Sequence, residues 1–211
     1  MIHSKSRLAI ELSKLKVFGN PDAGKEQYPT DSEIAADALW NANYQGDIEG
    51  KTIADFGAGT GILGIGALLI GARMVYFIEK DEAALEIAKE NLKSLEGAIE
   101  GEAVFIHGDV QDFNEKVDII IQNPPFGTNK RHADREFLMK AFETAHIIYS
   151  FHKTSTKNFV MKIADDNNYR ITHNWNYAFP IKATQLFHKK KIHRIRVGCW
   201  RMERVTLKNS V

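Results

Sequence analysis

The stretch Asp55-Phe56-Gly57-Ala58-Gly59-Thr60-Gly61 stands between an apolar run at residues 52–56 and a segment with helical character at residues 62–70. Glycines at such a strand-to-helix turn let the backbone pass close to a ligand. Glu79 follows the next apolar run, residues 74–78, and a carboxylate there can accept both ribose hydroxyls of a nucleoside. These features predict a βαβ unit that binds a nucleoside cofactor.

Strand and helix patterns continue to alternate after this unit. We expect further strands at residues 103–107, 117–122 and 146–151, and helices at residues 82–95, 134–145 and 154–165. Residues 167–205 are expected to form a basic pair of antiparallel strands. The alternation predicts an α/β fold with a doubly wound, mostly parallel sheet and an antiparallel C-terminal strand pair, in which ligands bind beyond the carboxyl ends of the strands.

The N-terminal part, residues 1–45, is expected to be an extension that packs on the catalytic face of a single domain spanning residues 1–211. Thr30-Asp31-Ser32-Glu33 is typical of a capping box, in which the Thr30 hydroxyl accepts a hydrogen bond from the Glu33 amide and a helix begins. Further upstream, three leucines recur at helical spacing and predict a short helix that covers the sheet: Leu8, Leu12 and Leu15.

The composition excludes several classes of protein. With 44% hydrophobic and 26% charged residues, the chain is typical of soluble globular proteins. Its longest apolar stretch, residues 61–72, contains four glycines and falls short of the roughly 20 residues that a membrane span needs. Charged residues interrupt any signal peptide, and Cys199 is the single cysteine. We therefore expect a cytoplasmic protein with neither a disulfide nor a metal site.

Charge is unevenly distributed along the chain. The net charge is +1, yet residues 167–202 contain eight Lys or Arg and no Asp or Glu. Such a block suits a polyanion, because neutralised phosphates release counterions, but a solvated strand face explains it equally well. The alternation predicts one face of the first C-terminal strand to be Ile171, His173, Trp175, Tyr177 and Phe179. In the second, Ile195, Val197 and Cys199 should lie opposite Arg194, Arg196 and Trp200.

The glycine turn is compatible with two nucleoside cofactors, S-adenosylmethionine and a nicotinamide dinucleotide. Residues 59–64 also satisfy the dinucleotide pattern, and a tight turn without a ligand is a third interpretation. Asp55 favours S-adenosylmethionine, because its carboxylate would repel a pyrophosphate but can hold the ammonium group of a methionine moiety. Asp109 follows the strand at residues 103–107 and could accept a hydrogen bond from an adenine amino group. The alternative for Asp109 is an ordinary turn residue.

Asn123-Pro124-Pro125-Phe126 directly follows the strand at residues 117–122. Consecutive prolines remove two amide donors and leave a loop rich in acceptors. An amino group on a planar ring is a poor nucleophile, because its lone pair is delocalised into the ring. The Asn123 side-chain oxygen and the Pro124 carbonyl can each accept one N–H and turn the lone pair toward a methyl carbon, while Phe126 stacks on the ring. A stiff connection with a core Phe is the alternative.

Five segments together resemble the methyltransferase-like protein 5 family: Glu26-Gln27-Tyr28-Pro29-Thr30, the Asp55 to Gly61 turn, Asn123-Pro124-Pro125-Phe126-Gly127-Thr128, Ser150-Phe151-His152-Lys153 and Phe187-His188-Lys189-Lys190-Lys191. The resemblance covers nearly the whole chain and implies a Rossmann-like class I methyltransferase fold. It also implies methyl transfer from S-adenosylmethionine to the N6 amino group of one adenosine in small-subunit ribosomal RNA. A small zinc-binding activator protein is a further partner that it raises. Glu79 replaces the usual Asp, and Ala58 and Thr60 replace cysteines of the eukaryotic turn, but neither departure removes a needed group.

The expected site residues fall into three groups. The catalytic loop is Asn123, Pro124, Pro125 and Phe126. The cofactor contacts, some implied by the resemblance, are Gln27, Thr30, Asp55, Gly57, Gly59, Gly61, Ile62, Glu79, Asp109 and Asn123. The RNA contacts are Lys153, His188, Lys189, Lys190, Lys191, Arg194 and Arg196, and His152, His188 and His193 are expected at the surface or facing RNA.

Other functions remain open at this point. Similar proline loops present guanine N2 or a glutamine amide for methylation. A subunit that binds RNA without catalysis would also explain the basic block. A nicotinamide-dependent dehydrogenase satisfies the glycine pattern, but it gives Asn123-Pro124-Pro125-Phe126 no role.

Overall fold

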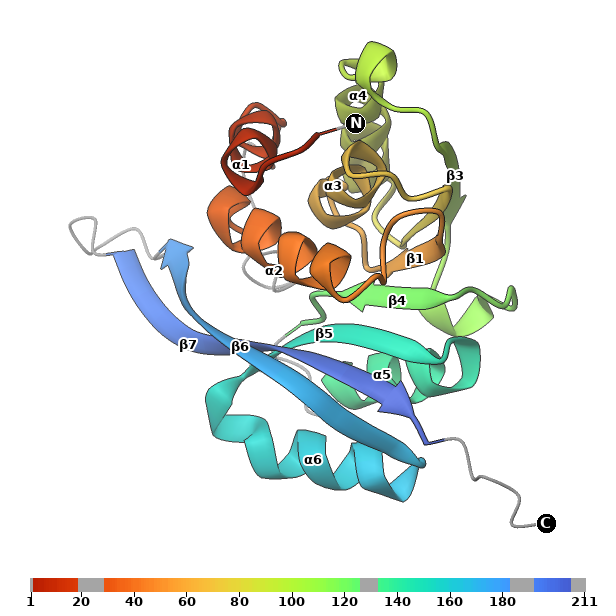
Figure 1. The fold of residues 1–211 in the computed structure, drawn as a ribbon, viewed down its shortest axis with the longest axis vertical. Coiled ribbons are helices and arrows are strands. Elements are labelled where there is room, and N and C mark those ends of the chain that lie inside the picture. The colour runs from red at the N-terminus through yellow and green to blue at the C-terminus, as the bar shows by residue number, and fades with distance from the viewer. Residues whose placement is uncertain (1, 19–28, 126–132, 183–191, 206–211) are drawn as a thin grey trace.

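The computed structural model describes residues 2–18, 29–125, 133–182 and 192–205 (Figure 1). Its helices are α1 (Lys5–Ser13), α2 (Ser32–Tyr44), α3 (Ile62–Leu69), α4 (Glu82–Lys93), α5 (Ala133–Thr144) and α6 (Lys157–Asp166). Its strands are β1 (Thr52–Phe56), β2 (Met74–Glu79), β3 (Glu102–His107), β4 (Ile119–Gln122), β5 (Ile147–Lys153), β6 (Tyr169–Lys182) and β7 (Ile192–Arg204). Short 3-10 helices are η2 (Glu96–Ala98), η3 (Val110–Asp112) and η4 (Thr154–Thr156).

The strands form one sheet in the order β3-β2-β1-β4-β5-β7-β6. Strands β1 to β5 pair in parallel, whereas β7 runs antiparallel to both β5 and β6. The fold class expected from the sequence is therefore confirmed. The chain moves outward from β1 to β3 and then returns to β4, so the strand order reverses between β1 and β4. Ligands bind at such a reversal in open α/β sheets.

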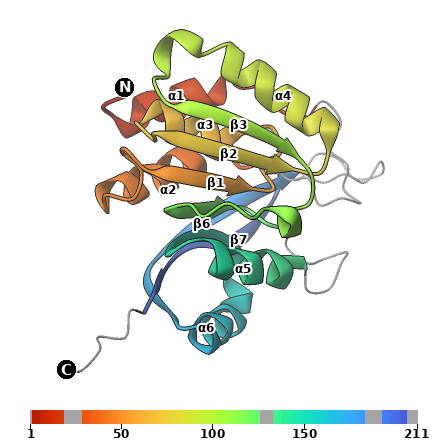
Figure 2. The same ribbon diagram turned by 90° about the vertical axis from the view of Figure 1, so that its right-hand side faces the viewer.

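Helices cover both faces of the sheet (Figures 1 and 2). On one face, α1, α2, α3 and α4 bury a core that includes Leu12, Leu39 and Phe77. On the other, α5 and α6 bury a second core that includes Phe56, Leu138 and Val160. Two-sided cover explains why β1 and β4 are buried along their whole length. None of the helices in the described part of the chain is long and apolar enough to cross a membrane.

Two local expectations are wrong. The cap of α2 is Asp31, whose side chain accepts hydrogen bonds from the Glu33 and Ile34 amides, so Thr30 lies outside the helix. A bulge in β6 between Ile171 and His173 shifts the register against β7. Because side chains alternate along a strand, the extra residue turns Ile171 to the face covered by α5 and α6, away from Trp175.

Candidate functional site

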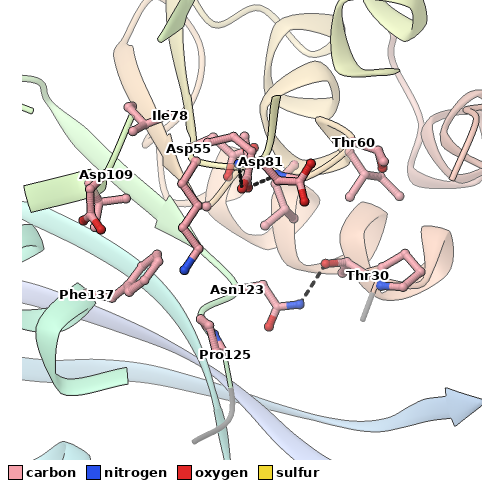
Figure 3. Close-up of a pocket in the computed structure, with 18 of the residues that line it drawn as sticks. Thr30, Asp55, Thr60, Ile78, Asp81, Asp109, Asn123, Pro125 and Phe137 are labelled. Carbon is pink, nitrogen blue, oxygen red and sulfur yellow. Dashed lines mark hydrogen bonds between the residues drawn. The ribbon is translucent and has the colours of Figure 1, made fainter. Parts of the chain in front are cut away.

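A cavity of about 360 Å³ opens at the carboxyl ends of β1, β2 and β4 (Figure 3). Its wall combines the glycine turn, the ends of these strands, the start of α5 and part of the N-terminal segment. The lining residues are Phe18, Pro29, Thr30, Asp55, Gly57, Ala58, Gly59, Thr60, Ile62, Leu63, Ile78, Glu79, Lys80, Asp81, Gly108, Asp109, Val110, Asn123, Pro125 and Phe137.

The glycine turn adopts a backbone that side chains would strain. Gly57, Gly59 and Gly61 have φ angles of 67°, 56° and 88°, in the left-handed region that favours glycine. A Cβ on Gly57 would lie 3.1 Å from the ring of Phe137, which packs against this glycine in the cavity wall. A Cβ on Gly61 would instead meet Ala88 and Ile65, so this glycine packs α3 against α4 and is absent from the cavity wall.

Glu79 joins the turn to the following helix. One carboxylate oxygen accepts the Gly59 amide at 2.8 Å, and the other accepts the Asp81 amide at 2.9 Å. Each oxygen of an ionised carboxylate can accept a second hydrogen bond. Glu79 therefore fixes the turn and can still receive two hydroxyl donors from a ligand in the cavity.

Asp55 is a buried carboxyl group at the floor of the cavity, with 1% of its surface exposed. It accepts the Gly64 amide at 2.8 Å. Burial raises its pKa to about 7, and the nearby Glu79 charge acts in the same direction. A positively charged ligand group would reverse this effect, since an opposite charge favours the ionised carboxylate.

Asp109 stands at the other end of the cavity, beside Ile78, Val110 and Phe137. Its carboxylate accepts the Gln111 amide at 3.0 Å and caps η3. Asp109 therefore both caps η3 and lines the cavity. The apolar neighbours suit a flat ring, and the remaining acceptor capacity of Asp109 suits an amino group on that ring.

Asn123 leaves the end of β4 and enters the cavity wall beside Thr30 (Figure 3). Its amide Nδ2 donates to the Thr30 hydroxyl at 3.0 Å. Its Oδ1 is buried and has no hydrogen-bond partner among the described residues. A buried acceptor without a donor costs about 1–3 kcal/mol, so this oxygen fits a donor that a substrate brings.

The cavity wall brings together most of the expected cofactor residues: Thr30, Asp55, Gly57, Gly59, Ile62, Glu79, Asp109 and Asn123. Pro125 lies in the wall, whereas Pro124 is buried outside it and Gly61 packs between helices. Gln27, Phe126, His188, Lys189, Lys190 and Lys191 lie outside the described residues.

The C-terminal strands extend beyond the carboxyl end of β5. The last β5 pair is Lys153 with Val197, after which β6 and β7 continue through five further pairs, about 17 Å at 3.3 Å per residue. Figure 1 shows this ribbon projecting past the same edge of the sheet at which β4 ends. Arg194 and Arg196 lie on it with exposed side chains.

His152 corrects an expectation, because only 2% of its surface is exposed. Its position in β5 opposite Gly198 turns it toward the α5 and α6 face of the sheet. The side chain of His193 is outside the described part of the chain.

Two aromatic residues of the cavity wall, Phe137 and Phe18, were not expected from the sequence. Phe137 belongs to an ordinary amphipathic pattern in α5, where nothing separates a wall residue from a core residue. Phe18 follows α1 and reaches the cavity only through the tertiary fold. Sequence spacing carries no signal for either placement.

Comparison with known proteins gives a consistent set of relatives. Residues 32–147 match the family model described as the methyltransferase small domain. An uncharacterised protein of Methanocaldococcus jannaschii is 39% identical, over 95% of this chain and 94% of that protein. The rRNA N(6)-adenosine-methyltransferase METTL5 of Danio rerio is 34% identical, over 88% of this chain and 92% of that protein. The crystal structure of a candidate RNA methyltransferase from Pyrococcus horikoshii has a TM-score of 0.88 at 44% identity, covering 98% and 100% of the two chains.

Proposed function

Since this chain belongs to the METTL5 family, within the methyltransferase small-domain class, we propose that it methylates the N6 amino group of an adenosine in small-subunit ribosomal RNA. The observation that carries the proposal is that Asn123 lines the cavity and that its buried Oδ1 lacks a hydrogen-bond donor among the described residues.

The cavity fits S-adenosylmethionine, the cofactor of this class of enzyme. Asp55 supplies a carboxylate for the ammonium group, Glu79 has two oxygens with spare acceptor capacity, and Asp109 lies beside apolar wall residues that suit an adenine ring. When bound, the cofactor supplies an electrophilic methyl group. The remaining work of the protein is to hold and orient the amine.

Asn123 orients the amine in this proposal. Its Oδ1 accepts one N–H of the adenine amino group, and the Pro124 carbonyl accepts the other. Both contacts draw the nitrogen lone pair out of conjugation with the ring and aim it at the methyl carbon. After transfer, the nitrogen loses one proton to solvent, so no dedicated base is needed.

The position of the projecting end of β6 and β7, which we call the basic ribbon, supports RNA as the substrate class. Arg194 and Arg196 are exposed on the part of β7 that passes beyond β5, at the edge of the sheet where the cavity opens. Phosphate contacts there would set the register of an RNA strand without reading its sequence. The target adenine would still have to leave its stack to reach Asn123.

Guanine N2 and a glutamine amide are the competing acceptors, because either is a planar amine that the same loop could hold. The names of the METTL5 relatives favour adenine N6. The zinc-binding activator subunit stays a prediction of the resemblance alone, because nothing in the described residues bears on it.

The direct experiment combines the protein with S-adenosylmethionine labelled in its methyl group and with ribosomes or ribosomal RNA from a strain that lacks the protein. We expect label in one nucleotide of the small-subunit RNA and N6-methyladenosine after digestion. Label in N2-methylguanosine, in large-subunit RNA or in protein would each overturn the corresponding part of the proposal.

A further inference from the structure

Three buried polar side chains form a hydrogen-bonded row that joins the neighbouring strands β4 and β5 next to the catalytic loop: Gln122, Ser150 and His152. Gln122 is the last residue of β4, and its Nε2 donates to Ser150 Oγ at 2.9 Å. Ser150 Oγ lies 2.7 Å from His152 Nε2. Gln122 and Ser150 are 0% exposed and His152 is 2% exposed, so water does not compete for these hydrogen bonds.

The protons in this row can be assigned from its chemistry. The Gln122 amide nitrogen can only donate, which leaves the Ser150 hydroxyl free to donate to His152 Nε2. In this arrangement the proton of His152 lies on Nδ1, which is 3.9 Å from a carboxylate oxygen of Asp134. Burial lowers the pKa of His152 to about 3, so the ring is neutral at physiological pH.

The row includes the residue before the catalytic loop and ends near the start of α5. Gln122 immediately precedes Asn123, and Asp134 is the second residue of α5, where the described chain resumes. Ser150 and His152 are two residues apart in β5, so they point to the same face of the sheet. Strand β5 therefore hydrogen-bonds the residue that precedes Asn123 and lies near the second residue of α5.

Burying polar side chains in this layer costs folding free energy. Their neighbours on the same face, Ile120, Ile148 and Met202, are apolar and fully packed. Apolar groups of similar shape could replace the row at little cost to folding. Gln122 Oε1 is moreover buried without a partner among the described residues. Stability of the fold does not account for these residues.

We propose that Ser150 and His152 are positioning residues that hold the catalytic loop, through Gln122, in the geometry that aims the amine. The inference rests on the proposed function, because it assigns a role in the same transfer step. Neither residue lines the cavity, so cofactor binding should not depend on them. A misplacement of about 1 Å in a catalytic group can cost on the order of 100-fold in rate.

The test compares Ser150→Val with Ser150→Thr, which have nearly the same shape and differ in one hydroxyl group. Purified full-length variants are assayed for cofactor affinity by calorimetry, for melting temperature, and for kcat and KM with ribosomal RNA. We expect Ser150→Val to lower kcat about 10- to 100-fold, with KM and cofactor affinity within about twofold. Ser150→Thr should retain most of the wild-type kcat. If the added methyl group prevents both variants from folding, Ser150→Ala gives the same comparison against wild type.

Tyr149→Phe is the matched control. Tyr149 neighbours Ser150 in β5 but points to the opposite face, where its hydroxyl donates to Asp47 at 2.5 Å. This variant loses a buried hydrogen bond from the same strand, so it should lower the melting temperature and leave kcat near the wild-type value. Equal kcat for Ser150→Val and Ser150→Thr, or an equal loss of kcat in Tyr149→Phe, would overturn the positioning role. Wild-type protein that methylates another acceptor would instead contradict the proposed function, and the Ser150 comparison could still be made on that acceptor.

Discussion

Asn123 and Thr30 are 93 residues apart in the chain, yet the Asn123 amide donates to the Thr30 hydroxyl at 3.0 Å. The contact exists because Asp31, and not Thr30, caps α2. Freed from the cap, Thr30 accepts from the donor end of the Asn123 amide, and Oδ1 is left without a donor among the described residues. The N-terminal segment thereby orients the group that we assign to catalysis.

Thr30→Val should therefore impair transfer more than Thr30→Ser. Valine keeps the shape but removes the hydroxyl, so the Asn123 amide loses the contact that fixes its rotation. We expect kcat to fall roughly tenfold, equivalent to the loss of about one hydrogen bond, while Thr30→Ser retains most of the activity. Steady-state kinetics with ribosomal RNA measures the difference. Equal activity of the two variants would contradict the role of the hydroxyl.

Cofactor affinity should depend on pH through Asp55. Burial raises the pKa of this carboxyl to about 7 in the free protein, and a bound cationic group favours the ionised form. Binding therefore releases a proton below pH 7, and affinity should fall about tenfold per pH unit there and level off above it. Calorimetry between pH 5.5 and 8.5 would show this.

Asp55→Asn provides the control for that profile. The variant should bind the cofactor more weakly at pH 8, because it lacks the negative charge. Its affinity should also no longer change with pH across the same range. A wild-type slope that persists in Asp55→Asn would assign the titration to another group.

RNA affinity should depend on salt through the ribbon arginines. Replacing Arg194 and Arg196 with glutamine removes two exposed charges, and we expect the slope of log affinity against log salt to decrease by about 1.4 to 1.8. Arg170→Gln is the matched control, because Arg170 lies at the other end of β6 and pairs with Glu203. RNA binding by both variants is measured over a range of KCl concentrations. An equal decrease of the slope in Arg170→Gln would contradict the assignment of Arg194 and Arg196 to the RNA interface.

Stability should depend strongly on Arg201. Its guanidinium donates to Asp47 at 2.7 Å in a buried site, and Asp47 also accepts the Tyr149 hydroxyl. Arg201→Met would leave the Asp47 charge buried without its cation, at a cost of about 3–5 kcal/mol in the free energy of unfolding. Urea denaturation measures this, with the exposed Arg170→Met expected to change stability by less than about 1 kcal/mol. Similar effects for the two variants would contradict the assignment.

The regular part of the fold follows from local patterns. The sequence predicts strands β1, β2 and β4 and the glycine turn after β1. Short buried strands appear as apolar runs, and turns with positive φ angles appear as glycines. The same patterns place Asp55, Glu79, Asp109 and Asn123 at one edge of the sheet, where the structure brings them together.

Other features depend on contacts that the sequence does not display. Thr30 and Asp31 can both cap a helix, and the structure uses Asp31, the residue type with the stronger capping preference. The bulge before His173 inserts one residue at a place where no glycine or proline marks it in the sequence. His152 lies in a run that includes Lys153 and resembles a surface segment, yet β5 pairs with β7 in the interior of the sheet and the side chain faces the layer of α5 and α6. The bulge and the burial of His152 concern residues whose environment comes from a distant part of the chain.

The most direct measurement is single-turnover methyl transfer by Asn123→Ala, together with the dissociation constant for S-adenosylmethionine. If Oδ1 of Asn123 receives the adenine amino group, the rate should fall at least about 100-fold, while the dissociation constant changes by less than about fivefold. A variant that transfers the methyl group at the wild-type rate would contradict the account.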